Sequence, residues 1–215
     1  MPAAHTILAR GPWEPESVTV RWRDDQFEPG ARHDHAADAA IARLRERGSP
    51  DHDGVAARLA GFSVQDGGLE LELQPLRWAL RLVPRDSSQS LSALTVVRDA
   101  EGRWLAGKRA PWLATWPGRW SLGAGGAVEV GESPVQTLNR ELEEEWAVTP
   151  TRVRCEALLL SQHNNAMLIG QAWLAAGAEV TPDEEHDSFA WWPADVDEWP
   201  REAHAALRRT AAMLA

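Results

Sequence analysis

The chain has 215 residues, of which 44% are hydrophobic and 25% charged, a composition typical of globular proteins that excludes a mostly disordered chain. Its formal net charge of -10 argues against binding to long nucleic acid, which requires a basic surface. With one cysteine no intrachain disulfide can form, and no apolar run is long enough to span a bilayer, so we expect a cytoplasmic protein without membrane contact.

The first part of the chain begins with a predicted strand and a predicted helix. Residues 17–23 alternate apolar and polar side chains, which is typical of a half-buried strand. Residues 31–47 are rich in alanine, carry apolar side chains at helical spacing and are followed by Gly48, a common helix stop.

A hairpin is expected next. Residues 61–66 and 69–76 alternate on either side of the turn at Asp66, Gly67 and Gly68. The segment 84–90 is polar and rich in turn residues, so we place the end of a small α+β extension within it, which gives an N-terminal unit of residues 1–88.

The second unit, residues 89–215, is expected to be one α/β domain. Residues 91–99 predict a β-branched strand that pairs with 101–109 across a turn at 100–102, and 110–125 is predicted to be irregular because it is rich in Pro, Trp and Gly. A helix over about 134–146 follows. Further expected elements are strands at 152–161, 166–175 and 188–193, and a helix from about Arg201.

The helix at 134–146 has a clear local start and one apolar face. Ser133 suits the N-cap, Pro134 the first helical position, and Gln136 completes a capping box. An apolar stripe formed by Val135, Leu138 and Leu142 would pack against a sheet.

Three glutamates share the other side of this helix. At about 100° per residue, Glu141, Glu144 and Glu145 lie within one arc of roughly 100°. Like charges at this spacing cost about 0.2–0.5 kcal/mol per pair, and negative charge near a helix C-terminus costs about 0.3–1 kcal/mol more. Such a cluster is either well solvated or binds a cation, and oxygen ligands on one face suit Mg²⁺ or Mn²⁺.

The spacing of these residues resembles the signature of the Nudix hydrolases. That signature runs from a glycine through a glutamate to an Arg-Glu pair, a Glu-Glu pair and a final glycine. The matching residues here are Gly126, Glu132, Arg140, Glu141, Glu144 and Glu145. The final glycine is the one departure, since Ala147 stands there.

The resemblance implies a role for each matching residue. Divalent cations, Mg²⁺ or Mn²⁺, would be bound by Glu141, Glu144 and Glu145 together with the carbonyl of Gly126. Arg140 and Glu132 would fix the loop and orient the carboxylates. The backbone turn would rely on Gly125, whose missing side chain allows close approach. Alanine at 147 would cost about 1 kcal/mol in the left-handed conformation that glycine adopts, unless the loop takes another path.

The segment that matches the signature, residues 126–148, is called the box below. In the hydrolysis that the resemblance implies, a water attacks a phosphorus atom, and a carboxylate inside or outside the box must take the proton of that water. Glu144 is one candidate. Glu184 and Glu185 in the acidic segment 181–187 are the others, because members of the family often draw the base from a late loop, although charged turns are usually only solvated.

Substrate contacts are expected just before the box. Lys108 and Arg109 end a predicted strand and could bind phosphates or be ordinary surface charges. Trp112, Trp116 and Trp120 could stack on a base, although core packing is the more common fate of such residues. We assign Lys108, Arg109 and Trp120 to substrate binding.

The resemblance therefore implies a Nudix α/β/α sandwich with a mixed sheet and a pyrophosphohydrolase activity on a small nucleotide diphosphate. The extension resembles, in its order of strand, helix and hairpin, the leading segment of UDP-sugar diphosphatases, which favours a nucleoside diphosphate joined to a sugar. A triphosphatase that sanitises the nucleotide pool and a catalytically silent nucleotide-binding module are the alternatives. A homodimer is left open.

Overall fold

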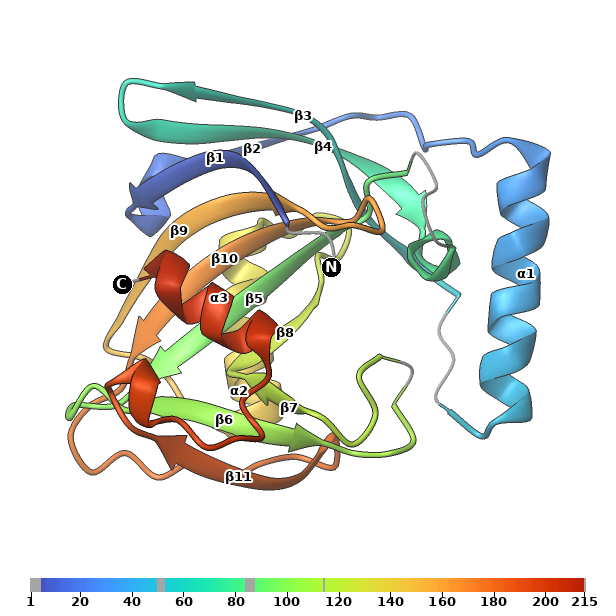
Figure 1. Ribbon diagram of the computed structural model, residues 1–215. Coiled ribbons are helices and arrows are strands. Elements are labelled where there is room, and N and C mark those ends of the chain that lie inside the picture. The colour runs from blue at the N-terminus through green and yellow to red at the C-terminus, as the bar shows by residue number, and fades with distance from the viewer. Residues whose placement is uncertain (1–4, 50–52, 84–87, 114, 215) are drawn as a thin grey trace.

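A computed structural model describes residues 5–49, 53–83, 88–113 and 115–214. Among these, eight strands form a mixed sheet, which Figure 1 shows as the centre of the molecule. Its main path contains, in spatial order, β1 (Thr6–Trp13), β9 (Arg152–Leu160), β10 (Ala166–Trp173), β5 (Leu91–Arg98), β6 (Trp104–Arg109) and β11 (His186–Trp192). Strand β7 (Trp120–Leu122) pairs with β6 and β8 (Ala124–Ala127) with β5. Strands β10 and β5 are parallel and the other neighbours antiparallel.

A second sheet of three strands is built from the N-terminal unit. Its order is β2 (Val18–Trp22), β4 (Gly68–Arg77) and β3 (Val55–Gln65). The predicted hairpin is confirmed, because Asp66 and Gly67 both have positive φ, 50° and 77°, as a tight turn between twisted strands requires. Strand β3 is tied to the domain that follows, since Ala57 N–H donates to the carbonyl of Val128 at 2.8 Å.

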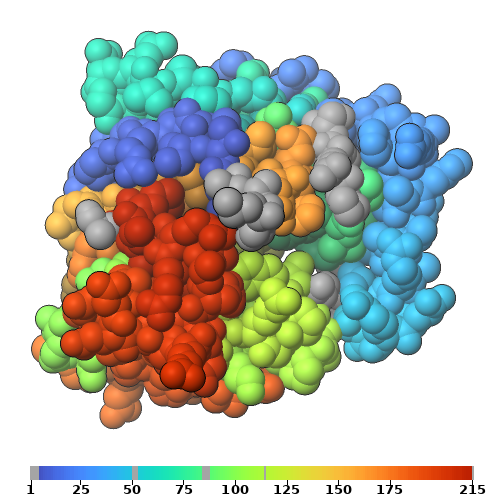
Figure 2. Space-filling model, in the orientation of Figure 1, coloured from blue at the N-terminus to red at the C-terminus, as the bar shows by residue number. Residues whose placement is uncertain are grey.

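Helices cover both faces of the large sheet (Figure 1). Helix α2 (Pro134–Trp146) packs on one face, and its buried side chains share a core with residues of the three-stranded sheet such as Leu71 and Leu73. Helix α3 (Ala205–Leu214) covers the opposite face, the front of the molecule in Figure 2. Helix α1 (Ala31–Glu46) lies at the side against the 3₁₀ helix η2 (Trp78–Leu82). Two further 3₁₀ turns are η1 (Pro15–Ser17) and η3 (Val196–Glu198).

The predicted fold class is confirmed, with three differences in detail. Segment 110–125 was expected to be irregular, yet it contains β7 and the start of β8, because backbone pairing with β6 and β5 orders it. The last helix begins at Ala205 rather than near Arg201, after a turn in which Ala203 N–H donates to the carbonyl of Pro200. Strand β1 has no counterpart among the predicted elements.

The proposed boundary at residue 88 stays a prediction. Residues 84–87 of the polar segment lie outside the described residues. Residues before the boundary contact residues after it. Strand β1 pairs with β9, and Val18 belongs to the same hydrophobic core as α2. No helix in the described part of the chain is long and apolar enough to cross a membrane.

Candidate active site

Helix α2 carries the candidate site and begins as predicted. Ser133 Oγ accepts from Gln136 N–H at 3.2 Å, and Gln136 Oε1 accepts from Ser133 N–H at 2.7 Å, which completes the capping box. Leu138 and Leu142 are fully buried against the sheet. The side of the helix that carries Glu141 and Glu145 faces β8.

Two glycines of β8 let this strand approach the carboxylates of α2, and the turn expected at Gly125 is instead extended strand, since neither glycine has a positive φ. A Cβ atom at Gly126 would clash with the carboxylate of Glu141, so a side chain here would force that carboxylate to move. One residue earlier, Gly125 N–H donates to Oε1 of Glu145 at 3.0 Å. The backbone at this point is thus in direct contact with two carboxylates.

Arg140 holds the acidic residues of the loop and the helix together. Its Nε donates to Glu132 Oε1 at 2.9 Å, and its Nη1 donates to Glu141 Oε1 at 2.8 Å and to Glu144 Oε2 at 2.9 Å. Burial lowers the pKa of Arg140, but its hydrogen bond to Glu132 and the charge of Glu141 outweigh that effect and raise the pKa. Thr137 Oγ1 also donates to Glu132, at 2.8 Å. Arg140 is therefore a fixed cation that orients three carboxylates.

Burial sets the electrostatics of the two inner carboxylates. Glu145 is 4% exposed, and its burial raises its pKa to about 9, reinforced by the charge of Glu141 and opposed by the Gly125 N–H. The pKa of Glu141 is also raised by burial, although Arg140 opposes that effect. Two buried carboxylates at neutral pH are stable as anions only beside a compensating positive charge.

A histidine outside the predicted set completes the inner side of the site. His186, at the start of β11, has a fully buried side chain whose Nε2 lies 3.7 Å from Glu145 Oε2. Its Nδ1 lies 3.2 Å from Asp183 Oδ1. A Cβ at Gly107 on the neighbouring strand would lie 2.3 Å from the imidazole, so that glycine makes room for it. Its local sequence offers no sign of this contact, because pairing between β11 and β6 creates it.

The acidic segment before β11 lies against the same site. Arg109 Nη2 and Glu185 Oε2 are 3.5 Å apart, and the charges of both act on the pKa of Glu145. Burial raises the pKa of Glu185, with Arg109 opposing it. The structure thus brings Arg109 and Glu185 to the box, whereas Glu184 is exposed.

Two residues assigned to substrate binding lie on the other face of the sheet. Lys108 alternates with Arg109 along β6 and pairs with Trp120 of β7. Trp120 packs against the core of α3, with its ring centroid 5.5 Å from that of Trp192. Trp112 is half-buried, and Trp116 is 41% exposed with its ring 4.7 Å from that of His204. Of the residues named before the box, Arg109 alone therefore lies beside the carboxylates.

The donor set fits a hard divalent cation. Glu145 Oε2 is buried without a hydrogen-bond partner, and the Gly125–Gly126 backbone forms a cradle that a side chain would fill. In the part of the chain that the structure describes, no three His, Cys, Asp or Glu side chains converge as a ready-made metal cluster. Arg140 Nη1 instead donates to oxygens of Glu141 and Glu144.

The comparisons with known proteins bear on the segment that contains this site. The family model of the NUDIX domain matches residues 89–210. No curated protein matches the chain.

Solved structures resemble somewhat more than half of the chain. A Deinococcus radiodurans protein is 20% identical, with 57% of this chain and 82% of that chain covered and a TM-score of 0.45. The NUDIX domain of Shewanella oneidensis NrtR, solved with ADP ribose, is 23% identical, with 58% and 86% covered and a TM-score of 0.44. A C. elegans Ap4A hydrolase is 16% identical, with 58% and 94% covered and a TM-score of 0.45.

Proposed function

Because this chain belongs to the NUDIX domain family of pyrophosphohydrolases, we propose that it is a metal-dependent hydrolase of a nucleoside diphosphate joined to another moiety. The products would be a nucleoside monophosphate and a phosphorylated second moiety. One observation carries the proposal: the largely buried carboxylates of Glu141 and Glu145 lie against the two glycines of β8, and Arg140 orients that of Glu141.

The cations would be held by Glu141, Glu144 and Glu145 together with the backbone carbonyl of Gly126. When bound, they neutralise charge on the phosphoryl oxygens and make a bound water more acidic. Arg140 and Glu132 keep the carboxylates oriented, since their ion pair is 2.9 Å long and only partly exposed. Loss of that pair would loosen the site without removing a ligand.

Glu185 is the better placed of the candidate bases. Glu144 is exposed and paired with Arg140, a partner that it can exchange for a cation, and it is itself one of the proposed ligands. Glu185 is half-buried, lies close enough to Glu145 to act on its pKa and is held by Arg109. A carboxylate beside the ligands, rather than among them, can accept the proton of the attacking water.

A nucleotide sugar is the proposed substrate class, on the grounds of the N-terminal extension. A compact triphosphatase needs little beyond the core domain, whereas here a second sheet shares a core with α2, and η2, which packs against α1, lines a hollow beside Glu141. ADP-ribose, dinucleoside polyphosphates and triphosphates are the competing substrates that the assay must separate.

The decisive experiment is a hydrolysis panel with Mg²⁺ or Mn²⁺. UDP-sugars, ADP-ribose, NADH, dinucleoside polyphosphates and nucleoside triphosphates would each be incubated with the wild type, Glu145→Gln and Glu143→Gln. Glu143 is an exposed glutamate on the same helix at a position that the signature leaves undefined, so its variant is a matched control. We expect metal-dependent release of a monophosphate from one class, lowered about a hundredfold or more by Glu145→Gln and unchanged by Glu143→Gln.

Two results would contradict the proposal. Turnover that survives in Glu145→Gln would exclude these glutamates as the metal site. No turnover by the wild type across the panel, with Mn²⁺ binding retained in calorimetry, would favour a nucleotide-binding module without catalysis.

A further inference from the structure

A hollow of about 350 Å³ lies where the N-terminal extension meets the box helix. Trp78 and Arg81 of η2 line it from one side. Ala127, Arg140 and Glu141 line it from the other. Its volume falls within the range of small-molecule sites, and it contains one of the proposed metal ligands.

Arg81 contributes a poorly compensated positive charge to this hollow. Its Nη2 donates to Ser92 Oγ at 3.1 Å, and no other side-chain acceptor for it is found among the described residues. A guanidinium has five N–H donors, and within the described residues only one of them has a side-chain acceptor. Burial lowers the pKa of Arg81, and the nearby charge of Glu141 opposes that effect. Its Cζ lies 5.4 Å from the ring centroid of Trp78, which holds the guanidinium in place.

We propose that Arg81 binds a phosphate group of the substrate in this hollow and that Trp78 is the residue that positions its guanidinium. The inference rests on the proposed function. Cations held by Glu141 would place further positive charge beside Arg81, and the two repel each other unless an anion lies between them. A phosphate oxygen suits that place, because arginine binds phosphate through two parallel hydrogen bonds. The extension would therefore supply a substrate contact that the box does not contain.

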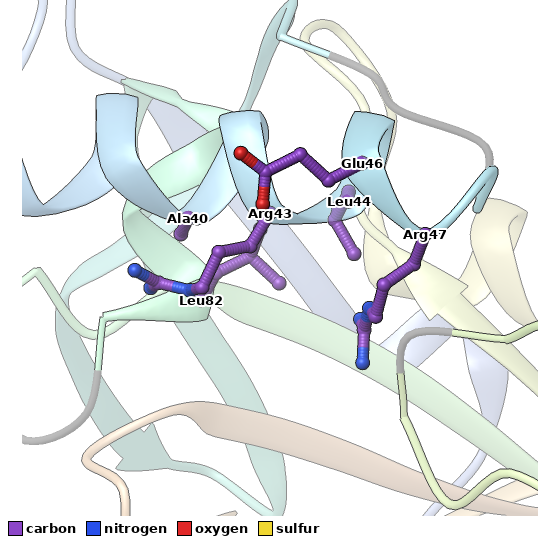
Figure 3. A pocket seen from close by; sticks show the side chains of 6 residues that line it. All are labelled: Ala40, Arg43, Leu44, Glu46, Arg47 and Leu82. Atoms are coloured by element: carbon purple, nitrogen blue, oxygen red, sulfur yellow. The ribbon is translucent and has the colours of Figure 1, made fainter.

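A second hollow beside η2 lacks these features. Figure 3 shows it between α1 and Leu82, with a volume of about 410 Å³. Its arginines, Arg43 and Arg47, are exposed and flank Glu46, and it contains no residue of the box. Arg43 is therefore a suitable control for the loss of one arginine near η2.

The test measures binding apart from turnover. The methylene-bridged analogues of ADP and UDP, which cannot be cleaved between their phosphates, would be titrated with Mg²⁺ into the wild type, Arg81→Gln and Arg43→Gln. We expect the dissociation constant of the tighter analogue to rise about tenfold or more in Arg81→Gln, as for loss of a charge-assisted hydrogen bond. Arg43→Gln should stay within twofold of the wild type.

Kinetics with the substrate found in the panel separate binding from structural damage. Arg81→Gln should raise KM by a similar factor and leave kcat within about threefold. Arg81→Lys keeps the charge but not the paired donors, so its KM should lie between those of Arg81→Gln and the wild type. Trp78→Leu should raise KM and Trp78→Phe should restore it in part, with thermal midpoints recorded for every variant.

A dissociation constant within twofold of the wild type in a folded Arg81→Gln variant would overturn the inference. In that case wild-type hydrolysis in the panel would still support the proposed function. Failure of both analogues to bind the wild type would overturn the inference as well. Absence of wild-type hydrolysis, by contrast, would contradict the proposed function whatever the variants show.

Discussion

Ala147 shows what the departure from the family signature means for the backbone. Its φ and ψ are 52° and 39°, so alanine adopts the left-handed conformation in which the family has glycine. The helix end is nevertheless well paired, since Ala147 N–H donates to the carbonyl of Glu143 at 3.0 Å. The sequence left open whether Ala147 adopts the strained left-handed conformation or the loop takes another path. The structure has the left-handed conformation, and the box carboxylates keep their places on the helix.

Replacing this residue should stabilise the protein. We expect Ala147→Gly to raise the free energy of unfolding by about 1 kcal/mol, because glycine has no Cβ to clash in this conformation. Urea unfolding measures the change. Ala178→Gly, at an exposed loop position without positive φ, is the control and should destabilise slightly through greater freedom of the unfolded chain. A loss of stability in Ala147→Gly would contradict the strain.

Cys155 is a core residue, as its place in an apolar strand predicts. It is fully buried in β9, and burial raises the pKa of its thiol to about 12, with the charges of Glu156 and Glu14 adding to the effect. We expect no alkylation by iodoacetamide at pH 8 in the folded protein and complete alkylation in urea, because the thiolate is the reactive form. Mass spectrometry gives the extent of labelling, and rapid labelling of the native protein would contradict this burial.

At the scale of one element, the start of α2 sets the position of the box glutamates. The capping box satisfies N–H groups that the helix itself leaves unpaired. We expect Ser133→Ala to lower the free energy of unfolding by about 1 kcal/mol. Ser133→Thr keeps the hydroxyl and should lose little. Denaturant unfolding of both variants provides the measurement, and equal stability of Ser133→Ala and the wild type would show that water replaces the cap without cost.

Strand β6 shows how an element divides its residues between two environments. Successive side chains of a strand point to opposite faces, so Lys108 and Arg109 cannot both reach the box. Which of them does so depends on the face that α2 covers. Leu105 belongs to the core on the α2 side, and Gly107 lies against the rings of His186 and Trp146, so Arg109, two residues further, is on that side as well. The sequence shows the alternation but not the face.

At the scale of the whole molecule, the N-terminal unit is part of the architecture around the site. Strand β1 extends the large sheet beside β9, and the three-stranded sheet covers part of the face on which α2 packs. Three leucines of β4, Leu69, Leu71 and Leu73, are completely or almost completely buried in the core that this sheet shares with α2. The extension therefore contributes to stability as well as to the hollow beside Glu141.

Removing the extension tests this dependence. We expect a fragment of residues 89–215 to lack cooperative unfolding and to aggregate, because it would expose apolar residues of the shared core such as Leu91 and Leu138. Size-exclusion chromatography and thermal unfolding, with the full chain as reference, measure the effect. A soluble fragment with a sharp transition would instead support the boundary near residue 88.

The sequence by itself determined the features that depend on neighbours a few residues away. The α2 helix with its cap, the hairpin at Asp66 and Gly67, and the alignment of Glu141, Glu144 and Glu145 on one side of a helix follow from local spacing and turn chemistry.

Tertiary structure alone decided which distant segments meet. Strand β1, the contact of His186 with Glu145 and the place of Arg81 beside Glu141 all depend on pairing and packing between segments far apart in the chain. Periodicity records which side of an element is apolar, but not the partner that covers it. The partner is selected by the total burial and hydrogen bonding of the folded chain, a property that no local window contains.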